Sequence, residues 1–118
     1  MVQIASLLEN IEIPLDGSPL SLSMAVRSGQ TYKASAHFMG ISDNTGFYYS
    51  LKITPSEASI LVSASGVHSV EGWGACSAVV VFTAKVGANI TISLDFESRD
   101  LSGTGRIYEC VILGEQTE

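Results

Sequence analysis

The sequence predicts an all-β protein, an antiparallel β-sandwich with about eight strands and no substantial helix. Two patterns carry this prediction. Apolar and polar residues alternate with a period of two through most of the chain, which places alternate side chains on opposite faces of a strand. Groups of glycine, proline, serine and asparagine interrupt this alternation about every 8 to 12 residues, as turns between short strands do.

The stretch from residue 75 to residue 96 is the centre of the predicted sandwich. In its second half, apolar residues occupy every second position from Ile90 to Phe96, as in a strand with one buried and one wet face. In its first half, residues 76–84 are nearly all apolar and rich in valine, which is typical of a strand that is covered on both faces or lies mid-sheet. Gly87 lies between the two halves and can supply the positive φ of a tight turn.

The beginning of the chain has a different pattern, which divides it into an arm (1–10) and a single sandwich domain (11–118). Ile4, Leu7 and Leu8 have the spacing of one helical turn or of a clasping arm, and they are candidates for docking the arm onto a neighbour. Alternation then resumes at residue 11, but Pro14 cannot donate a hydrogen bond to a sheet. We therefore expect an edge strand or a continuation of the arm there.

The remaining elements follow in order along the chain. We expect further strands over residues 20–26, 32–38, 47–53, 60–64 and 107–113. We expect loops over residues 42–46, 65–74 and 98–105, where turn-forming residues gather. The acidic tail after Gly114 lies outside the last strand.

Composition limits the class of protein. A chain of 118 residues fits one domain, and a net charge of -6 disfavours binding to nucleic acid and to anionic membranes. The start lacks the basic region of a signal peptide, and no apolar run is long enough to span a bilayer, so we expect synthesis in a cytoplasm. Cys76 and Cys110 have apolar neighbours and are interpreted as buried free thiols rather than a disulfide.

No catalytic motif, metal-ligand spacing or cofactor motif was found, so we expect no enzyme, no metal and no cofactor. His37 is expected on the outer face of a strand. The predicted loop 65–74 contains His68 and Trp73, and Tyr48 is expected to point away from its sheet. Trp73, His68 and Tyr48 are candidate contacts for a partner or a glycan, since flat aromatic side chains supply much contact area. Trp73 has an equally simple alternative, a plug over the end of its own sandwich.

Three stretches resemble the jelly-roll domain of the tumour necrosis factor and complement globular-head type. These are GQTYKAS at residues 29–35, FTAKVGANI at residues 82–90 and RIYECVILG at residues 106–114, and the match spans residues 29–114. The resemblance implies a homotrimer in which sandwiches pack around an axis. Small acidic proteins of this kind are also similar to proteins of bacteriophage particles that decorate the head or form a fibre tip.

We therefore expect a non-enzymatic structural or attachment protein of a bacteriophage virion, such as a capsid decoration or fibre-tip protein, that self-associates as a trimer. Its other partners would be virion proteins such as the major capsid or tail protein. The alternative is a carbohydrate-binding module that uses Trp73, and with it Tyr48, to stack on a host surface glycan. Within the virion function, the sequence features are the same for head decoration and for a fibre tip.

Overall fold

The computed structural model describes residues 2–7, 11–13, 20–42, 47–68, 72–98 and 105–117. These residues form ten strands and no helix, and eight of the strands have six or more residues, which confirms the predicted all-β class. The strands are β1 (Val2–Leu7), β2 (Ile11–Ile13), β3 (Leu20–Ala25), β4 (Thr31–Ser42), β5 (Phe47–Ile53), β6 (Ala58–Ala64), β7 (Gly66–His68), β8 (Gly72–Ala84), β9 (Asn89–Ser98) and β10 (Gly105–Gln116). Accordingly, no helix that could span a membrane is found among these residues.

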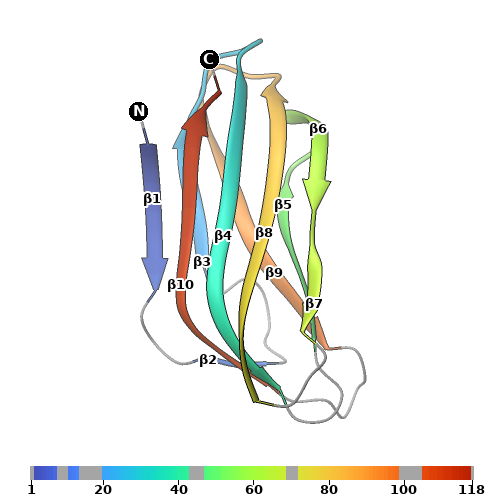
Figure 1. Cartoon of the computed structure of the whole chain (residues 1–118). Helices are drawn as coiled ribbons and strands as arrows, with labels where there is room; N and C mark the ends of the chain where they lie inside the picture. The colour runs from blue at the N-terminus through green and yellow to red at the C-terminus, as the bar shows by residue number, and fades with distance from the viewer. Residues whose placement is uncertain are drawn as a thin grey trace.

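The strands pair antiparallel in two sheets that face each other (Figure 1). Sheet A, in front in Figure 1, has the order β1-β10-β4-β8-β6, and β2 pairs with one end of β10. Sheet B, behind it, has the order β3-β9-β5-β7. From β2 to β10 every even-numbered strand is in sheet A and every odd-numbered strand in sheet B, so the chain changes sheet at each connection. This repeated crossing gives the sandwich its jelly-roll-like connectivity.

The two-residue alternation in the sequence corresponds to the two faces of each sheet. In β4, Tyr32, Ala34, Ala36 and Phe38 are buried between the sheets, and the residues between them face outward. Strand β8 lies mid-sheet between β4 and β6, as its valine-rich sequence predicted. The core is therefore a single layer of side chains between sheets A and B.

Aromatic rings fill one end of this core. The ring of Phe38 from sheet A lies edge-on to Tyr49 and Phe96 of sheet B, with centroid distances of 5.0 and 5.2 Å. Phe47 completes the cluster at 5.8 Å from Phe96. Edge-to-face contacts of this kind add to the free energy gained by burying the rings, and they hold the two sheets together at this end.

The connection between β8 and β9 differs from the tight turn expected around Gly87. The two strands belong to different sheets, and the connection carries the chain across the sandwich. Among the described glycines, the positive φ is found at Gly29, where φ is 85°, and not at Gly87. Gly29 lies in the turn between β3 and β4, in which the amide of Gln30 donates to the carbonyl of Arg27.

The N-terminal segment is an edge strand rather than a helical turn. Strand β1 pairs with β10 along its whole length, and the Gln3 side chain links it to sheet B. The Gln3 Nε2 donates to the carbonyl oxygen of Ala25 at 3.2 Å, and the Ala25 amide donates to Gln3 Oε1 at 3.0 Å. Leu8, Pro14 and the rest of residues 8–10 and 14–19 lie outside the described residues, and the division into arm and domain stays a prediction.

Two other boundaries differ from the prediction. The expected loop 65–74 is largely strand, because β7 ends at His68 and β8 begins at Gly72. At the other end of the chain, β10 continues through Gly114 to Gln116. Gly114 is buried against sheet B, where an added Cβ would lie 2.8 Å from Met24 Sδ and 2.9 Å from Leu22 Cδ2. A glycine at this position is therefore required by close packing between the sheets and does not end the strand.

Candidate interaction surface

The outer faces of the two sheets differ in chemistry. The described outward side chains of sheet B are mostly small and polar: Ser21, Ser23, Ala25, Tyr48, Ser50, Lys52, Thr91, Ser93 and Asp95. The outer face of sheet A carries more apolar side chains: Ile4, Met39, Ile41, Val62, Ala75, Val79, Val81, Tyr108, Val111 and Leu113. Polar and charged side chains lie among them: Ser6, Thr31, Lys33, Ser35, His37, Ser59, Ser77, Thr83, Arg106, Glu109 and Glu115. A solvated sheet face is normally polar, so the apolar face of sheet A is the candidate functional surface of this molecule.

The strand register aligns these apolar side chains in rows. One row crosses five of the six strands of sheet A: Ile4 pairs with Leu113, Leu113 with Ser35, Ser35 with Val79, and Val79 with Ala64. Ile4 is 62% exposed, while Leu113 and Val79 are partly buried by their neighbours. Because side chains opposite each other on paired strands touch, the row forms a continuous strip across the sheet.

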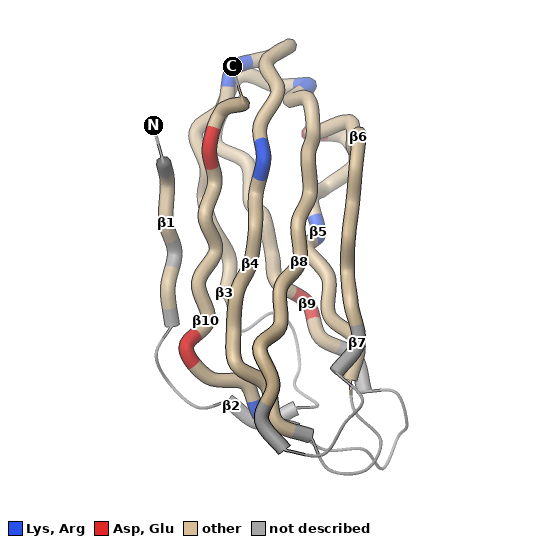
Figure 2. The backbone as a smooth tube through the Cα atoms, in the orientation of Figure 1, with Lys and Arg blue, Asp and Glu red and all other residues tan. Residues whose placement is uncertain are grey.

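Charges are few on this face and are balanced in sign. In the next row Glu115 of β10 pairs with Lys33 of β4, so an acidic and a basic residue are neighbours. Arg106 and Glu109 lie nearer the other end of β10. Figure 2 shows that the central stretches of β4, β8 and β6 carry no charged residue. The described part of the face is thus close to neutral, although the whole chain has a net charge of -6.

Two shallow depressions lie in the middle of the face, and His37 and Ser77 line both of them. The first has a volume of about 360 Å³ and is also lined by Met39, Ala75 and Glu109. The second has a volume of about 270 Å³ and extends along β4 toward the β6 edge, where Ala64 lines it. Small side chains on β8 leave these hollows between the longer side chains of the neighbouring strands.

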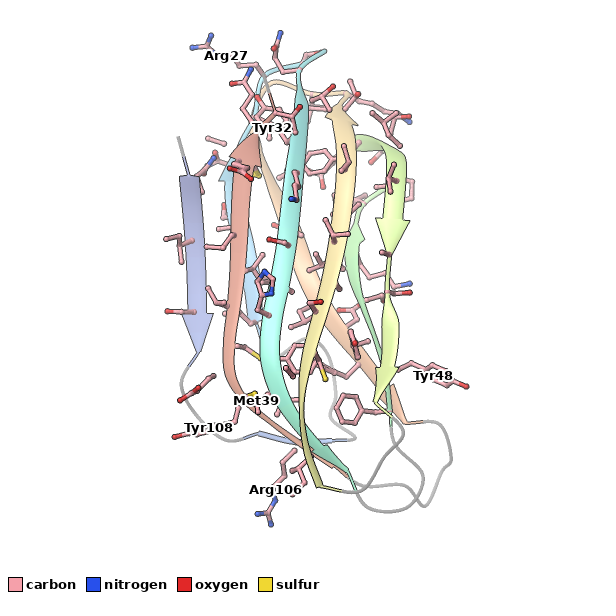
Figure 3. All side chains as sticks on the ribbon, viewed as in Figure 1. Arg27, Tyr32, Met39, Tyr48, Arg106 and Tyr108 are labelled. Carbon is pink, nitrogen blue, oxygen red and sulfur yellow. The ribbon has the colours of Figure 1, made fainter. Side chains whose placement is uncertain are left out.

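A β-bulge in β10 shapes the first depression. The pairing of β10 with β4 shifts register between Tyr108 and Val111, and Glu109 has a φ of 55°. The bulge puts Ile107 and Cys110 on the core side, three positions apart instead of two. It leaves Tyr108 39% exposed, and Figure 3 shows Tyr108 and Arg106 pointing away from the sandwich. The sequence did not predict this change of phase, because alternation alone puts Ile107 and Glu109 on one face.

The two cysteines lie behind this face and are buried and free, as predicted. Burial raises the pKa of the Cys110 thiol to about 11, with a smaller contribution from the nearby Cys76. Burial also raises the pKa of Cys76, against a hydrogen bond with Tyr49 that lowers it. Both thiols are therefore protonated at neutral pH and act as small apolar core residues, since the thiolate is the reactive form.

Of the three predicted contact residues, Tyr48 and His68 lie on the paired strands β5 and β7 of sheet B, and Trp73 lies in sheet A. Tyr48 is in β5 and is 48% exposed on the outer face of sheet B, as expected. Trp73 is in β8 of sheet A and pairs with Ile41, and His68 is in β7 and pairs with Phe47, so both belong to strands instead of a loop. The structure places no described aromatic side chain beside Tyr48 on the outer face of sheet B.

The predicted arm contacts have different outcomes. Ile4 is exposed and lies in the apolar row of sheet A. The side chain of Leu7 and the whole of Leu8 lie outside what the structure describes. His37 is exposed on the outer face of β4, as expected, and in the part of the chain that the structure describes no three His, Cys, Asp or Glu side chains gather as metal ligands would.

No protein-family model matches the chain, and no curated protein matches its sequence. Among solved structures, the chain is similar to the tripod (BppUct-A-L) from the baseplate of bacteriophage Tuc2009. The TM-score is 0.52 at 15% identity, over 94% of this chain and 62% of the baseplate chain. The chain therefore spans less than two thirds of the length of that protein.

Two further solved structures are similar at lower scores. An apo form cyclase from Fischerella sp. has a TM-score of 0.44 at 17% identity, over 84% of this chain and 55% of the cyclase chain. The CBM22-1-GH10 modules of the Clostridium thermocellum xylanase 10B, complexed with xylohexaose, have a TM-score of 0.42 at 17% identity, over 94% of this chain and 25% of that one. At such identities the likeness concerns the fold alone. The class that the fold and surface define is an antiparallel β-sandwich with one apolar outer face.

Proposed function

We propose that this protein is a non-enzymatic structural or attachment protein of a bacteriophage particle, and that it self-associates as a trimer through the outer face of sheet A. The observation that carries the proposal is that the outer face of sheet A has many more apolar side chains than the outer face of sheet B. Apolar side chains gathered on one face are stabilised when a partner removes them from water, at about 25 cal/mol per Å² of apolar area.

Charge and size favour a second copy of the chain as the occupant of this face. Two copies that each carry a net charge of -6 repel each other, and a contact through a nearly neutral face keeps the excess acidic groups apart. The sandwich measures 43 × 23 × 22 Å, so one broad face offers on the order of the 800 Å² per partner that a standard interface buries. Ile4 lies in the same face, which supports a role for the first strand in docking.

The virion role rests on the fold. The similar fold of the baseplate tripod supports a place in a phage particle as a decoration, fibre-tip or baseplate component, with the major capsid or tail protein as a further partner. The alternation of strands between the sheets supports the jelly roll of the tumour necrosis factor and complement type. A carbohydrate-binding role has less support, because Trp73 and Tyr48 belong to strands of different sheets.

Replacing Ser77 by arginine tests the self-association. Ser77 is exposed in the centre of the face and lines both depressions, so an arginine there blocks docking without disturbing the core. We expect the native chain to sediment as a trimer and Ser77→Arg as a monomer in analytical ultracentrifugation. The matched control is Thr91→Arg, which adds the same side chain to an exposed position on the outer face of sheet B and leaves the trimer intact.

Three outcomes would contradict the proposal. The first is a native chain that stays monomeric at high concentration, and the second is a trimer that Thr91→Arg dissociates as well as Ser77→Arg does. The third concerns the virion: purified particles of the phage that encodes the protein should contain it as a regular component, and its absence from them would remove the structural role.

A further inference from the structure

Strand β6 carries an apolar knob at one edge of sheet A. Ile60, Leu61 and Val62 are consecutive residues with exposed fractions of 47%, 57% and 56%. Apart from Ala58, every residue of this seven-residue strand is exposed, and none of its residues is charged. Edge strands usually carry charged residues or proline, which prevent contacts with other chains, and β6 has neither.

The knob results from a β-bulge. The pairing of β6 with β8 shifts register between Ile60 and Val62, so that Leu61 has no partner in β8. Ile60 pairs with the buried Phe82, whereas Val62 pairs with Val81, which faces outward. The three apolar side chains are therefore spread around the edge of the sheet from its core side to its outer face.

The bulge also makes edge-to-edge pairing of two β6 strands unfavourable. In a regular strand Ile60 and Val62 would share a face, and they would continue to share it in a strand added alongside. Here Ile60 and Val62 face opposite sides of the sheet. A second strand that paired regularly with β6 would therefore be out of register beyond Leu61. The apolar surface at this edge is thus shaped as a protrusion and not as a template for another strand.

The same molecule carries a hollow that suits this protrusion. The depression of about 360 Å³ on the outer face of sheet A is lined by Met39, Ala75 and Ser77, and also by His37 and Glu109. A closed apolar cavity of about 150 Å³ holds a benzene ring, so this hollow has room for a branched aliphatic side chain. An apolar patch and a hollow at different places on one molecule produce a heterologous contact, which closes into a ring when the rotation permits.

We propose that the β6 knob, centred on Leu61, docks in the depression lined by Met39, Ala75 and Ser77 of a second copy of this chain. This inference rests on the proposed self-association and identifies the surface that docks on the outer face of sheet A. Each copy contributes its β6 edge to one neighbour and its sheet A face to the other. Such a head-to-tail arrangement uses both apolar surfaces of every copy, and closure after three copies gives the trimer.

Site-specific cross-linking tests the pairing of knob and hollow. Leu61→Cys and Ala75→Cys each place a thiol at an exposed position, whereas Cys76 and Cys110 are buried. With a short bismaleimide, we expect neither variant alone to form linked dimers, because Leu61 meets Ala75 of the neighbour and not itself. An equal mixture of the two should give linked dimers, and the double variant should give linked trimers. Thermal melts check that each variant is folded.

A charge at the knob gives an independent test. Leu61→Asp should weaken association by at least about tenfold, the cost expected for a central contact. The control Ser59→Asp adds the same charge to an exposed residue of the same strand and should leave association unchanged. Self-linking of Leu61→Cys, or a trimer that persists in Leu61→Asp, would overturn the knob-and-hollow contact while leaving the apolar face intact. A native chain that is monomeric would instead reject the self-association itself.

Discussion

Glu109 is a described residue whose backbone conformation the sequence did not predict. Its φ of 55° lies in the left-handed region, which costs a residue with a Cβ roughly 1–2 kcal/mol. Glu109 lies in the β10 bulge and lines the larger depression on the outer face of sheet A. Backbone strain is often found at binding sites, and the strain at Glu109 is consistent with binding of a partner at this depression.

Replacing Glu109 by glycine should therefore stabilise the fold. Glycine adopts a positive φ without the Cβ clash, and we expect the free energy of unfolding to rise by about 1 kcal/mol. Urea unfolding in the Ser77→Arg background, in which association does not contribute, measures the change. The matched variant Glu115→Gly, also exposed in β10, should lose about 0.5–1 kcal/mol because glycine weakens a regular strand. Equal losses in both variants would show that the bulge stores no strain.

At the scale of the element, β1 is the strand whose role changed most between sequence and structure. Its apolar spacing suggested a helical turn or an arm, but six residues cannot form a stable helix alone, and β10 offers a free edge. Two hydrogen bonds between the Gln3 side-chain amide and the backbone of Ala25 connect β1 in sheet A to β3 in sheet B. Gln3 thus fixes a strand that otherwise pairs on one side only.

Gln3→Ala should loosen β1 selectively. Losing the two hydrogen bonds removes about 1–2 kcal/mol and leaves the core unchanged, so we expect faster local opening of the edge. Hydrogen-deuterium exchange should rise at residues 2–7, while the amides of β8 and β9 keep their protection. Ser6→Ala, at an exposed position on the same strand, serves as the control and should not alter exchange. Unchanged exchange in Gln3→Ala would mean that pairing with β10 alone holds the strand.

At the scale of the whole molecule, two effects act in opposite directions on self-association: repulsion from the net charge and burial of apolar surface. A net charge of -6 opposes the approach of a second copy, whereas the apolar face and the β6 knob favour it. Salt screens exposed charges over about 8 Å at physiological strength and weakens repulsion more than it weakens apolar burial.

Association should therefore tighten as salt is added. Sedimentation at about 0.05 and 0.5 M NaCl should give a larger trimer fraction at the higher concentration, because the repulsion between acidic copies is screened. A variant away from the contact gives the control: Asp95→Asn, on the outer face of sheet B, removes one negative charge from the net charge of -6, and it should reduce the salt dependence. Weaker association at high salt would point to ion pairs, such as contacts of Lys33 or Glu115, as the main attraction.

The sequence by itself determined the all-β class, most strand positions and the burial of both cysteines. Each of these depends on neighbours along the chain: alternation in β3, β4 and β9 sets which side chains face the core, and Cys76 and Cys110 alternate in phase with the buried Ala78 and Ile112. The sequence also put Tyr48 and His37 on outer faces for the same reason.

Only the tertiary structure decided which outer faces become continuous surfaces. The row from Ile4 to Ala64 joins residues from five strands that are far apart in the chain, and register between strands is not encoded in the alternation of any one of them. The bulges at Leu61 and Glu109 shift that register by single residues, which local patterns do not reveal. The knob, the hollow and the contrast between the two sheets therefore appear only once the strands are paired.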